Sequence, residues 1–347
     1  MDFKNPYLRL LQTDLADKVF SDRGRDIPLY KPPEGNLELF KPTRWNLTGC
    51  VNIDIFLKHF SQSYGLTGSG KSNGVSRLCE QLLLKHVKLF IVDKKGEFIT
   101  LTGLRGANVK IYRMMQKTFE DEKAQIEARR EEGAALAVDY LDGNASIVLN
   151  LGGERAEDYL PFLLQFFSDL WQKRKEEKMK ADAEGRPTIP NKTIIEEAKN
   201  FVPQFPDANL SNKMKEISLG LISIVKSIST EGRSFGETTH LSSQRPMQLD
   251  SSIRGQGEVF FFYKQTYPNE LEFYLKMMPH ERGDRDKLKI DFAEMKSGSC
   301  YFVKFGSAEY VNMRKKKTKD MASTPGYAEL MGWKNGNEDE NASGGEN

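Results

Sequence analysis

Residues 65–72 read GLTGSGKS, the complete pattern G-x-x-x-x-G-K-[ST] of a phosphate-binding loop. The glycines let the backbone curl so that its N–H groups face an anion, and the helix that follows presents its positive end. Lys71 would reach the β- and γ-phosphates of ATP, and the Ser72 hydroxyl would bind Mg²⁺. The alternative is a Gly/Ser turn ahead of an ordinary helix. We expect nucleotide contacts from the whole loop: Gly65, Thr67, Gly68, Ser69, Gly70, Lys71, Ser72 and Asn73.

Composition narrows the class of protein. A chain of 347 residues with 38% hydrophobic residues can build one large or two ordinary domains. The net charge of +2 is nearly neutral, so any surface for nucleic acid must be local. Three well-separated cysteines fit no metal pattern and are typical of reduced thiols. The first residues lack the apolar segment of a signal peptide, and no apolar run could span a bilayer, so we expect a cytoplasmic protein.

Apolar patterning around the loop predicts a repeating strand–helix order. Residues 73–86 have apolar side chains at helical spacing, and residues 88–92 (KLFIV) form a short apolar strand. A strand, the loop, this helix and the next strand make a βαβ unit, which predicts a parallel sheet in an α/β fold. Residues 159–171 should form a buried helix. Further strands are expected at 146–151, 193–195, 239–243, 258–264 and 299–303, the last of which should end the sheet.

The alternation of elements predicts one α/β domain over residues 46–312, which includes the phosphate-binding loop. Residues 1–45 would be an N-terminal arm, irregular or with a small strand pair. Two charged segments, 112–135 and 172–187, read as helical or loop insertions, the first being a solvated surface helix. Residues 313–347 are basic and then acidic, which is typical of a disordered tail.

A pair of carboxylates follows one of the short strands. Ile194 and Ile195 are followed by Glu196 and Glu197. Glu196 could hold magnesium through water, and Glu197 could orient and polarise an attacking water. The alternative is a helix start with glutamates in its first turn. Because the pair occurs in a chain with a complete phosphate-binding loop, we favour hydrolysis of the nucleotide.

Residues 231–246 carry a third group of candidates. Gln244 would lie at the tip of a strand beside the catalytic one and sense the γ-phosphate. Arg233 and Arg245 are candidates for an arginine that reaches a neighbouring subunit's nucleotide. For either arginine, the alternative is a surface ion pair.

Together these segments resemble the HerA/FtsK superfamily of ring-forming DNA-pumping ATPases, and the HerA branch most closely. Five stretches carry the resemblance in order: VNIDIFLKHFSQSYGLTGSGKSN, LFIVDKKGEF, IIEEAKNFVP, EGRSFGETTHLSSQRP and SGSCYFVKFGSAEYVNMRKKKT. The resemblance implies a RecA-like P-loop NTPase core with a mostly parallel sheet flanked by helices. It also implies ATP and Mg²⁺ as cofactors, a homo-oligomer that is usually a hexamer, and double-stranded DNA as a sequence-independent partner.

By position, the resemblance gives Glu196 the metal role, Glu197 the catalytic role, Gln244 the sensor role, and Arg233 or Arg245 the role of an arginine acting across subunits. Asp93 and Glu97 match signature positions whose role stays open, with strand-end polarity as the alternative. The basic run after Met313, and Lys213 and Lys215, are candidate DNA contacts or simply solvated charges.

Two departures from the HerA pattern bear on partners. The segment ahead of the motor is too short for the N-terminal β-barrel of HerA proteins, on which a nuclease would dock, and Lys199 replaces the usual histidine. We therefore expect a stripped motor from a mobile element, a conjugation system or a virus, with a nuclease or a secretion or packaging partner left open. The alternative functions are a type IV secretion, conjugation or viral packaging ATPase, and a protein whose assembly is gated by ATP.

Overall fold

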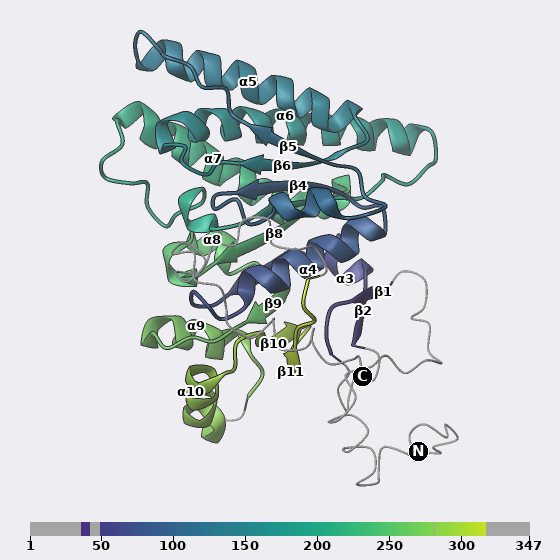
Figure 1. Ribbon diagram of the computed structural model, residues 1–347, viewed down its shortest axis with the longest axis vertical. Helices are drawn as coiled ribbons and strands as arrows, with labels where there is room; N and C mark the ends of the chain where they lie inside the picture. The colour runs from purple at the N-terminus through teal and green to yellow at the C-terminus, as the bar shows by residue number, and fades with distance from the viewer. Residues whose placement is uncertain (1–35, 42–48, 281, 317–347) are drawn as a thin grey trace, which may run out of the picture.

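A computed structural model describes residues 36–41, 49–280 and 282–316 of the chain. In these residues a nine-stranded sheet forms the centre (Figure 1). Its strands are β3 (Ser61–Tyr64), β4 (Lys88–Asp93), β5 (Val109–Arg113), β6 (Ser146–Asn150), β7 (Asn191–Ile195), β8 (Glu237–Ser243), β9 (Val259–Phe262), β10 (Ser299–Lys304) and β11 (Ser307–Asn312). They lie in the order β11-β10-β9-β3-β8-β7-β4-β6-β5.

The sheet is mostly parallel, as the sequence predicts. Every pairing from β9 across to β5 is parallel, whereas β10 pairs antiparallel with both β9 and β11. The expected βαβ unit is present as β3, helix α4 (Lys71–Leu84) and β4. Two strands, β8 and β7, lie between its two strands. This spacing leaves room for the tips of β8 and β7 beside the phosphate-binding loop.

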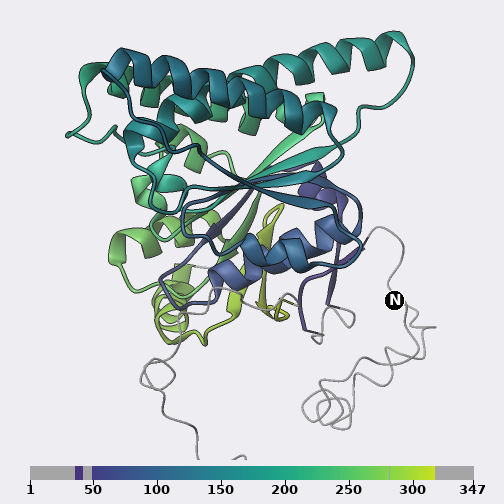
Figure 2. The ribbon, with the colours of Figure 1, turned by 45° about the horizontal axis from the view of Figure 1, so that its top comes forward.

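Alternating side chains on the strands build two cores, one on each face of the sheet. On β4, Phe90 and Val92 join one core, and Leu89 and Ile91 join the other. The first core is covered by α5 (Glu122–Asp142), α6 (Ala156–Ala183), α7 (Asn212–Glu231), α8 (Ser251–Arg254), α9 (Pro268–Met277) and α10 (Arg285–Glu294). The second is covered by α4, α3 (Asp54–Leu57) and the antiparallel pair β1 (Asn36–Glu38) and β2 (Cys50–Asn52). Figure 2 shows α4 on the opposite side of the sheet from α5 and α6.

The predicted strands are confirmed, with two corrections at the edges of the sheet. The strand expected at 299–303 is β10, but it does not end the sheet, because β11 folds back on it and forms the edge. Residues 109–113 form the other edge strand, β5, which overlaps the segment expected to be helical. Both edge strands are short and largely exposed, so they lack the long apolar run that marks a central strand.

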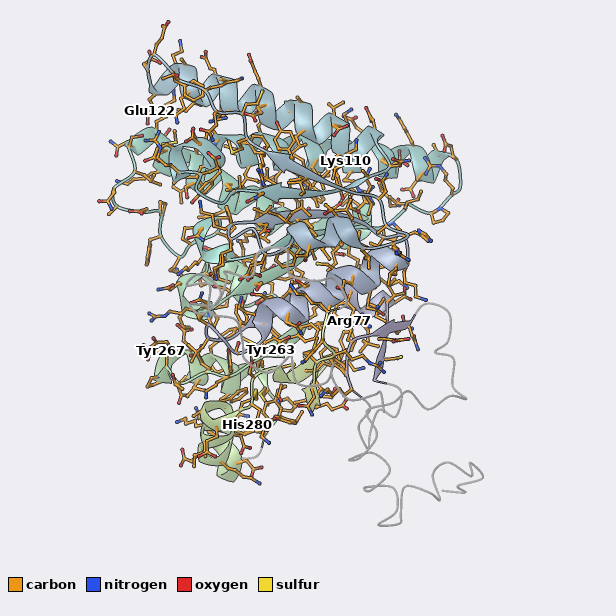
Figure 3. All side chains as sticks on the ribbon, in the orientation of Figure 1. Arg77, Lys110, Glu122, Tyr263, Tyr267 and His280 are labelled. Carbon is orange, nitrogen blue, oxygen red and sulfur yellow. The ribbon has the colours of Figure 1, made fainter. Side chains whose placement is uncertain are left out.

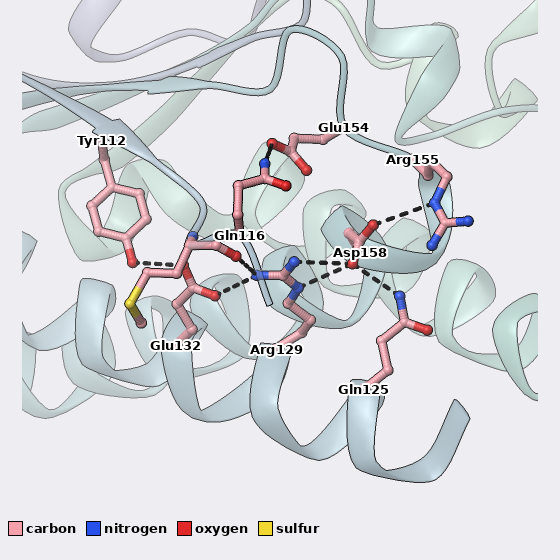
Figure 4. Close-up of polar contacts among 9 residues, drawn as sticks. Tyr112, Gln116, Gln125, Arg129, Glu132, Glu154, Arg155 and Asp158 are labelled. Carbon is pink, nitrogen blue, oxygen red and sulfur yellow. Dashed lines mark hydrogen bonds and ion pairs between the residues drawn. The ribbon is translucent and has the colours of Figure 1, made fainter. Parts of the chain in front are cut away.

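The charged segment 112–135 is not a fully solvated helix, contrary to the sequence-based expectation. Helix α5 starts at Glu122 and packs along α6, where Arg129 is 2% exposed. The Arg129 guanidinium donates to Glu132 Oε2 at 2.8 Å and to Asp158 Oδ1 at 3.0 and 3.1 Å (Figure 4). Some charged side chains of this helix are therefore buried against α6, and each of them has a partner of opposite charge.

The ends of the chain are described only in part. The predicted arm 1–45 and tail 313–347 lie mostly outside the described residues. Within the arm, β1 pairs with β2, which begins at Cys50. No helix in the described part of the chain combines the length and apolarity needed to cross a bilayer.

Candidate nucleotide-binding and hydrolysis site

The candidate residues come together because the carboxyl ends of neighbouring parallel strands lie along the same side of the sheet. The phosphate-binding loop follows β3, Glu196 and Glu197 follow β7, and Gln244 follows β8. Strand β8 lies between β3 and β7, so its tip is flanked by the loop on one side and the two glutamates on the other. A ligand crevice at the carboxyl ends of the strands is the usual arrangement in open α/β sheets.

The phosphate-binding loop is held by backbone contacts from three directions. Gly65 N–H donates to the β8 residue Ser243, and Leu66 N–H donates to Lys264 after β9. Gly298 N–H donates to the Ser69 carbonyl at 2.8 Å. Gly70 precedes α4 with φ +91°, and a Cβ there would lie 2.6 Å from the Gly298 nitrogen. The second glycine of the motif is thus required by both backbone conformation and close packing.

Lys71 bridges the loop to the acidic strand. Its side chain is 4% exposed, and its ammonium donates to Glu196 Oε1 and to Ser242 Oγ, each at 2.9 Å. The Ser72 hydroxyl lies 3.4 Å from the same Glu196 oxygen. The Lys71 charge is therefore compensated by Glu196. A buried lysine next to a carboxylate is poised to exchange that partner for a phosphate.

Glu197 is held between two neighbouring strand tips. Its backbone is left-handed, at φ +51° and ψ +47°, an uncommon conformation for a residue other than glycine. Gln244 Nε2 donates to Glu197 Oε1 at 2.7 Å, and Lys95 forms an ion pair with the same oxygen. Although burial favours the neutral acid, the Lys95 hydrogen bond and the Lys71 charge hold the pKa of Glu197 below its usual range. Glu197 is thus an ionised acceptor at neutral pH.

Asp93, whose role the sequence left open, organises the loop after β4. Its carboxylate accepts hydrogen bonds from the backbone N–H groups of the loop at 2.8 to 3.2 Å, namely those of Lys95, Gly96, Glu97 and Phe98. Burial raises the pKa of Asp93, and these four donors oppose that rise. Asp93 therefore shapes the loop that carries Lys95 toward Glu197.

The two candidate arginines lie in different places. Arg245 directly follows Gln244, and its guanidinium lies 4.2 Å from the ring centroid of Tyr267, which is labelled in Figure 3. Arg233 is exposed in the turn Gly232–Phe235 before β8, at the opposite end of the strand from Gln244. The structure places Arg245 at the carboxyl end of β8, where the site lies, and Arg233 at the amino end of the same strand.

The remaining loop residues differ in what they face. Thr67 and Gly68 are exposed at the rim, whereas Ser69 is buried. The Asn73 side chain donates to the Arg314 carbonyl at 3.3 Å and accepts from Lys316 N–H at 3.2 Å. Asn73 therefore fastens the segment after β11 onto α4.

The acidic side of the site fits a magnesium ion. The Ser72 hydroxyl and the Glu196 carboxylate are hard oxygen donors of the kind that Mg²⁺ prefers. Glu196 Oε2 is buried and has no hydrogen-bond partner among the described residues. The described residues hold no group of three or more His, Cys, Asp or Glu side chains arranged for a metal. Mg²⁺ is commonly held by one or two carboxylates together with substrate phosphates, and the Ser72 and Glu196 oxygens fit that arrangement.

Two residues that the sequence analysis did not single out lie among the candidate residues that the structure brings together. Ser242 and Lys95 both contact the charged core of the site, and neither belongs to a motif that specifies the contact. The signal that could have found them is the parallel sheet itself. Once β4 and β8 are known to flank β7, polar residues at their carboxyl ends become candidates.

Comparison with known proteins shows the family to which this chain belongs. The family described as "Helicase HerA, central domain" matches residues 43–298. The chain therefore belongs to this family, within the HerA/FtsK-type ATPases. A search of curated protein sequences finds no match.

Solved structures share the fold. The conjugation coupling protein TcpA of pCW3, in its monomer form with ATPγS, is 13% identical, with a TM-score of 0.53 over 84% of this chain and 69% of that one. VirB4 of Thermoanaerobacter pseudethanolicus is 11% identical, with a TM-score of 0.54 over 82% of this chain and 98% of that one. These likenesses support the α/β P-loop NTPase fold.

Proposed function

We propose that this protein is a cytoplasmic, ATP-dependent DNA translocase that hydrolyses ATP at the subunit interfaces of a ring, most simply a hexamer. It would move duplex DNA through a central pore without regard to sequence. The observation that carries the proposal is the joining of Lys71 to Glu196 beneath the phosphate-binding loop, with Glu197 next in the chain. This is the arrangement that hydrolysis of a bound triphosphate requires.

The chain's own residues divide the chemical work. The loop N–H groups and Lys71 would bind the phosphates, and Ser72 and Glu196 would hold Mg²⁺. When bound, the ion neutralises charge that develops on the phosphate oxygens. Glu197 accepts a hydrogen bond from the attacking water, and Gln244 links Glu197 to the tip of β8. Both ion pairs that the structure shows at these glutamates are made by lysines, Lys71 and Lys95. We propose that an arginine from a neighbouring subunit completes the site, as the subunit interfaces of a ring would allow.

Two other functions share this core. One is a secretion, conjugation or viral packaging ATPase, and the conjugation coupling protein TcpA shows that the fold occurs in one such setting. The other is an assembly protein in which ATP only switches the oligomeric state. The paired glutamates favour turnover over switching, because a switch needs no positioned base.

The test is the ATPase rate of the purified chain with and without linear duplex DNA, together with particle mass in the presence of ATP. We expect DNA to stimulate hydrolysis and ATP to support a ring. Lys71→Ala should abolish turnover. Glu197→Gln should still bind ATP while losing about 10²–10⁴-fold in kcat. Glu131→Gln, an exposed glutamate on α5, is the control and should match wild type.

Other outcomes are equally clear. Full turnover by Glu197→Gln would remove the assignment of the base. A rate indifferent to DNA would favour the secretion ATPase. Slow, unstimulated hydrolysis with ATP-dependent ring formation would favour the assembly protein.

A further inference from the structure

Glu197 is contacted from both strands that neighbour its own. Strand β7 ends at Ile195 between β8 and β4. Gln244, just past β8, and Lys95, just past β4, reach the glutamate from its two sides. Both donate to Oε1, so the side chain is fixed by one oxygen.

The other carboxylate oxygen is left without a donor. Glu197 Oε2 is buried and has no hydrogen-bond partner among the described residues. An unmatched buried acceptor costs free energy unless it acquires a partner. A water molecule on the nucleotide side would supply that partner, and it would be the water that a general base must hold.

The loop that delivers Lys95 is built for one conformation. Four backbone N–H groups converge on Asp93, and Gly96 takes φ +76°, which only glycine adopts without strain. Lys95 is thereby aimed by a rigid turn, although its side chain is 37% exposed. The neighbouring Lys94 points elsewhere: it donates to the Leu151 carbonyl and lies over the Tyr159 ring.

We propose that Lys95 is a positioning residue for hydrolysis, which with Gln244 grips Oε1 of Glu197 and so presents Oε2 to the attacking water. This inference rests on the proposed function, since it assigns a role within the same ATPase site. Lys95 acts through Glu197 and does not bind the nucleotide.

The experiment compares Lys95→Met with Lys94→Met in steady-state ATP hydrolysis and in binding of a non-hydrolysable ATP analogue. Lys95→Met should lower kcat about 10–100-fold, as expected for a misplaced base, with KM and analogue affinity within about twofold of wild type. Lys94→Met removes an adjacent charge that does not touch Glu197 and should keep the wild-type kcat. Thermal unfolding of each variant shows that it is folded.

A second arm isolates the route through Glu197. Lys95→Met added to Glu197→Gln should lower the residual rate by less than about twofold, because the side chain that Lys95 positions is already disabled. An unchanged kcat in Lys95→Met, a weakened analogue affinity, or an equal further loss in the Glu197→Gln background would each overturn the inference. Absence of ATP hydrolysis by the wild-type chain would instead refute the proposed function.

Discussion

At the scale of single residues, Gly68 and Gly70 separate two reasons for glycine in a phosphate-binding loop. Both have positive φ, +77° and +91°. A Cβ on Gly68 would meet nothing within 4 Å, whereas a Cβ on Gly70 would meet the Gly298 backbone at 2.6 Å. Within the described chain, Gly68 is thus needed for its conformation, and Gly70 for its conformation and for close packing.

We predict that Gly70→Ala destabilises the protein more than Gly68→Ala. Gly68→Ala should cost about 1–2 kcal/mol in the free energy of unfolding, the strain of a left-handed residue with a Cβ. Gly70→Ala should add the cost of moving Gly298, which holds the loop through Ser69. Denaturant unfolding of both variants checks this, and equal losses would show that Gly298 yields without cost.

The sequence predicts a role only for residues whose spacing within a local motif indicates their chemistry. The phosphate-binding loop is complete along the chain, so Lys71 and Ser72 are recognisable without any tertiary knowledge. Lys95 is not, because its function depends on β4 lying beside β7. The role of Asp93 could not be predicted for the same reason. Its four backbone partners are close in sequence, but the loop that they shape directs Lys95 toward Glu197, which is distant in sequence.

At the scale of elements, α5 shows why a charged pattern misleads. The segment reads as solvated because Arg and Glu are normally exposed. In the fold, α6 offers Asp158 to Arg129, while Tyr112 and the Met115 backbone N–H donate to Glu132 (Figure 4). Such partners come from three segments and leave no periodic signal in the sequence. The apolar helix α6 was predictable because its pattern alone requires burial.

We predict that Arg129→Met destabilises the α5–α6 layer strongly. The substitution leaves Glu132 and Asp158 without their shared cation, which should cost about 3–5 kcal/mol in the free energy of unfolding. Lys123→Met on the same helix is the control. Lys123 and Glu127 form an exposed pair at 3.9 Å, so its loss should change stability by about 0.5 kcal/mol or less. Comparable losses in the two variants would mean that the buried network contributes no more than a surface pair.

At the scale of the whole molecule, the positions of the arginines favour one arrangement of subunits. In a head-to-tail ring, the surface that faces a neighbour's site differs from the surface that carries a subunit's own site. Arg233 is exposed at the edge of the sheet away from its own loop. Arg245 stacks on Tyr267 beside its own site. We therefore propose Arg233 as the residue that acts on a neighbour and Arg245 as a local support.

This proposal predicts that two inactive variants restore each other when mixed. In rings assembled from equal amounts of Lys71→Ala and Arg233→Ala subunits, about a quarter of interfaces would combine an intact lysine with an intact neighbouring arginine. Mixed rings should therefore recover up to about a quarter of the wild-type ATPase rate, since each site needs both groups. Lys71→Ala mixed with Arg245→Ala should recover activity only if Arg245 is the residue that crosses the interface. Recovery in that mixture and none with Arg233→Ala would reverse the assignment. If neither mixture recovers activity although particle mass shows that rings form, neither arginine is the group that completes the neighbour's site.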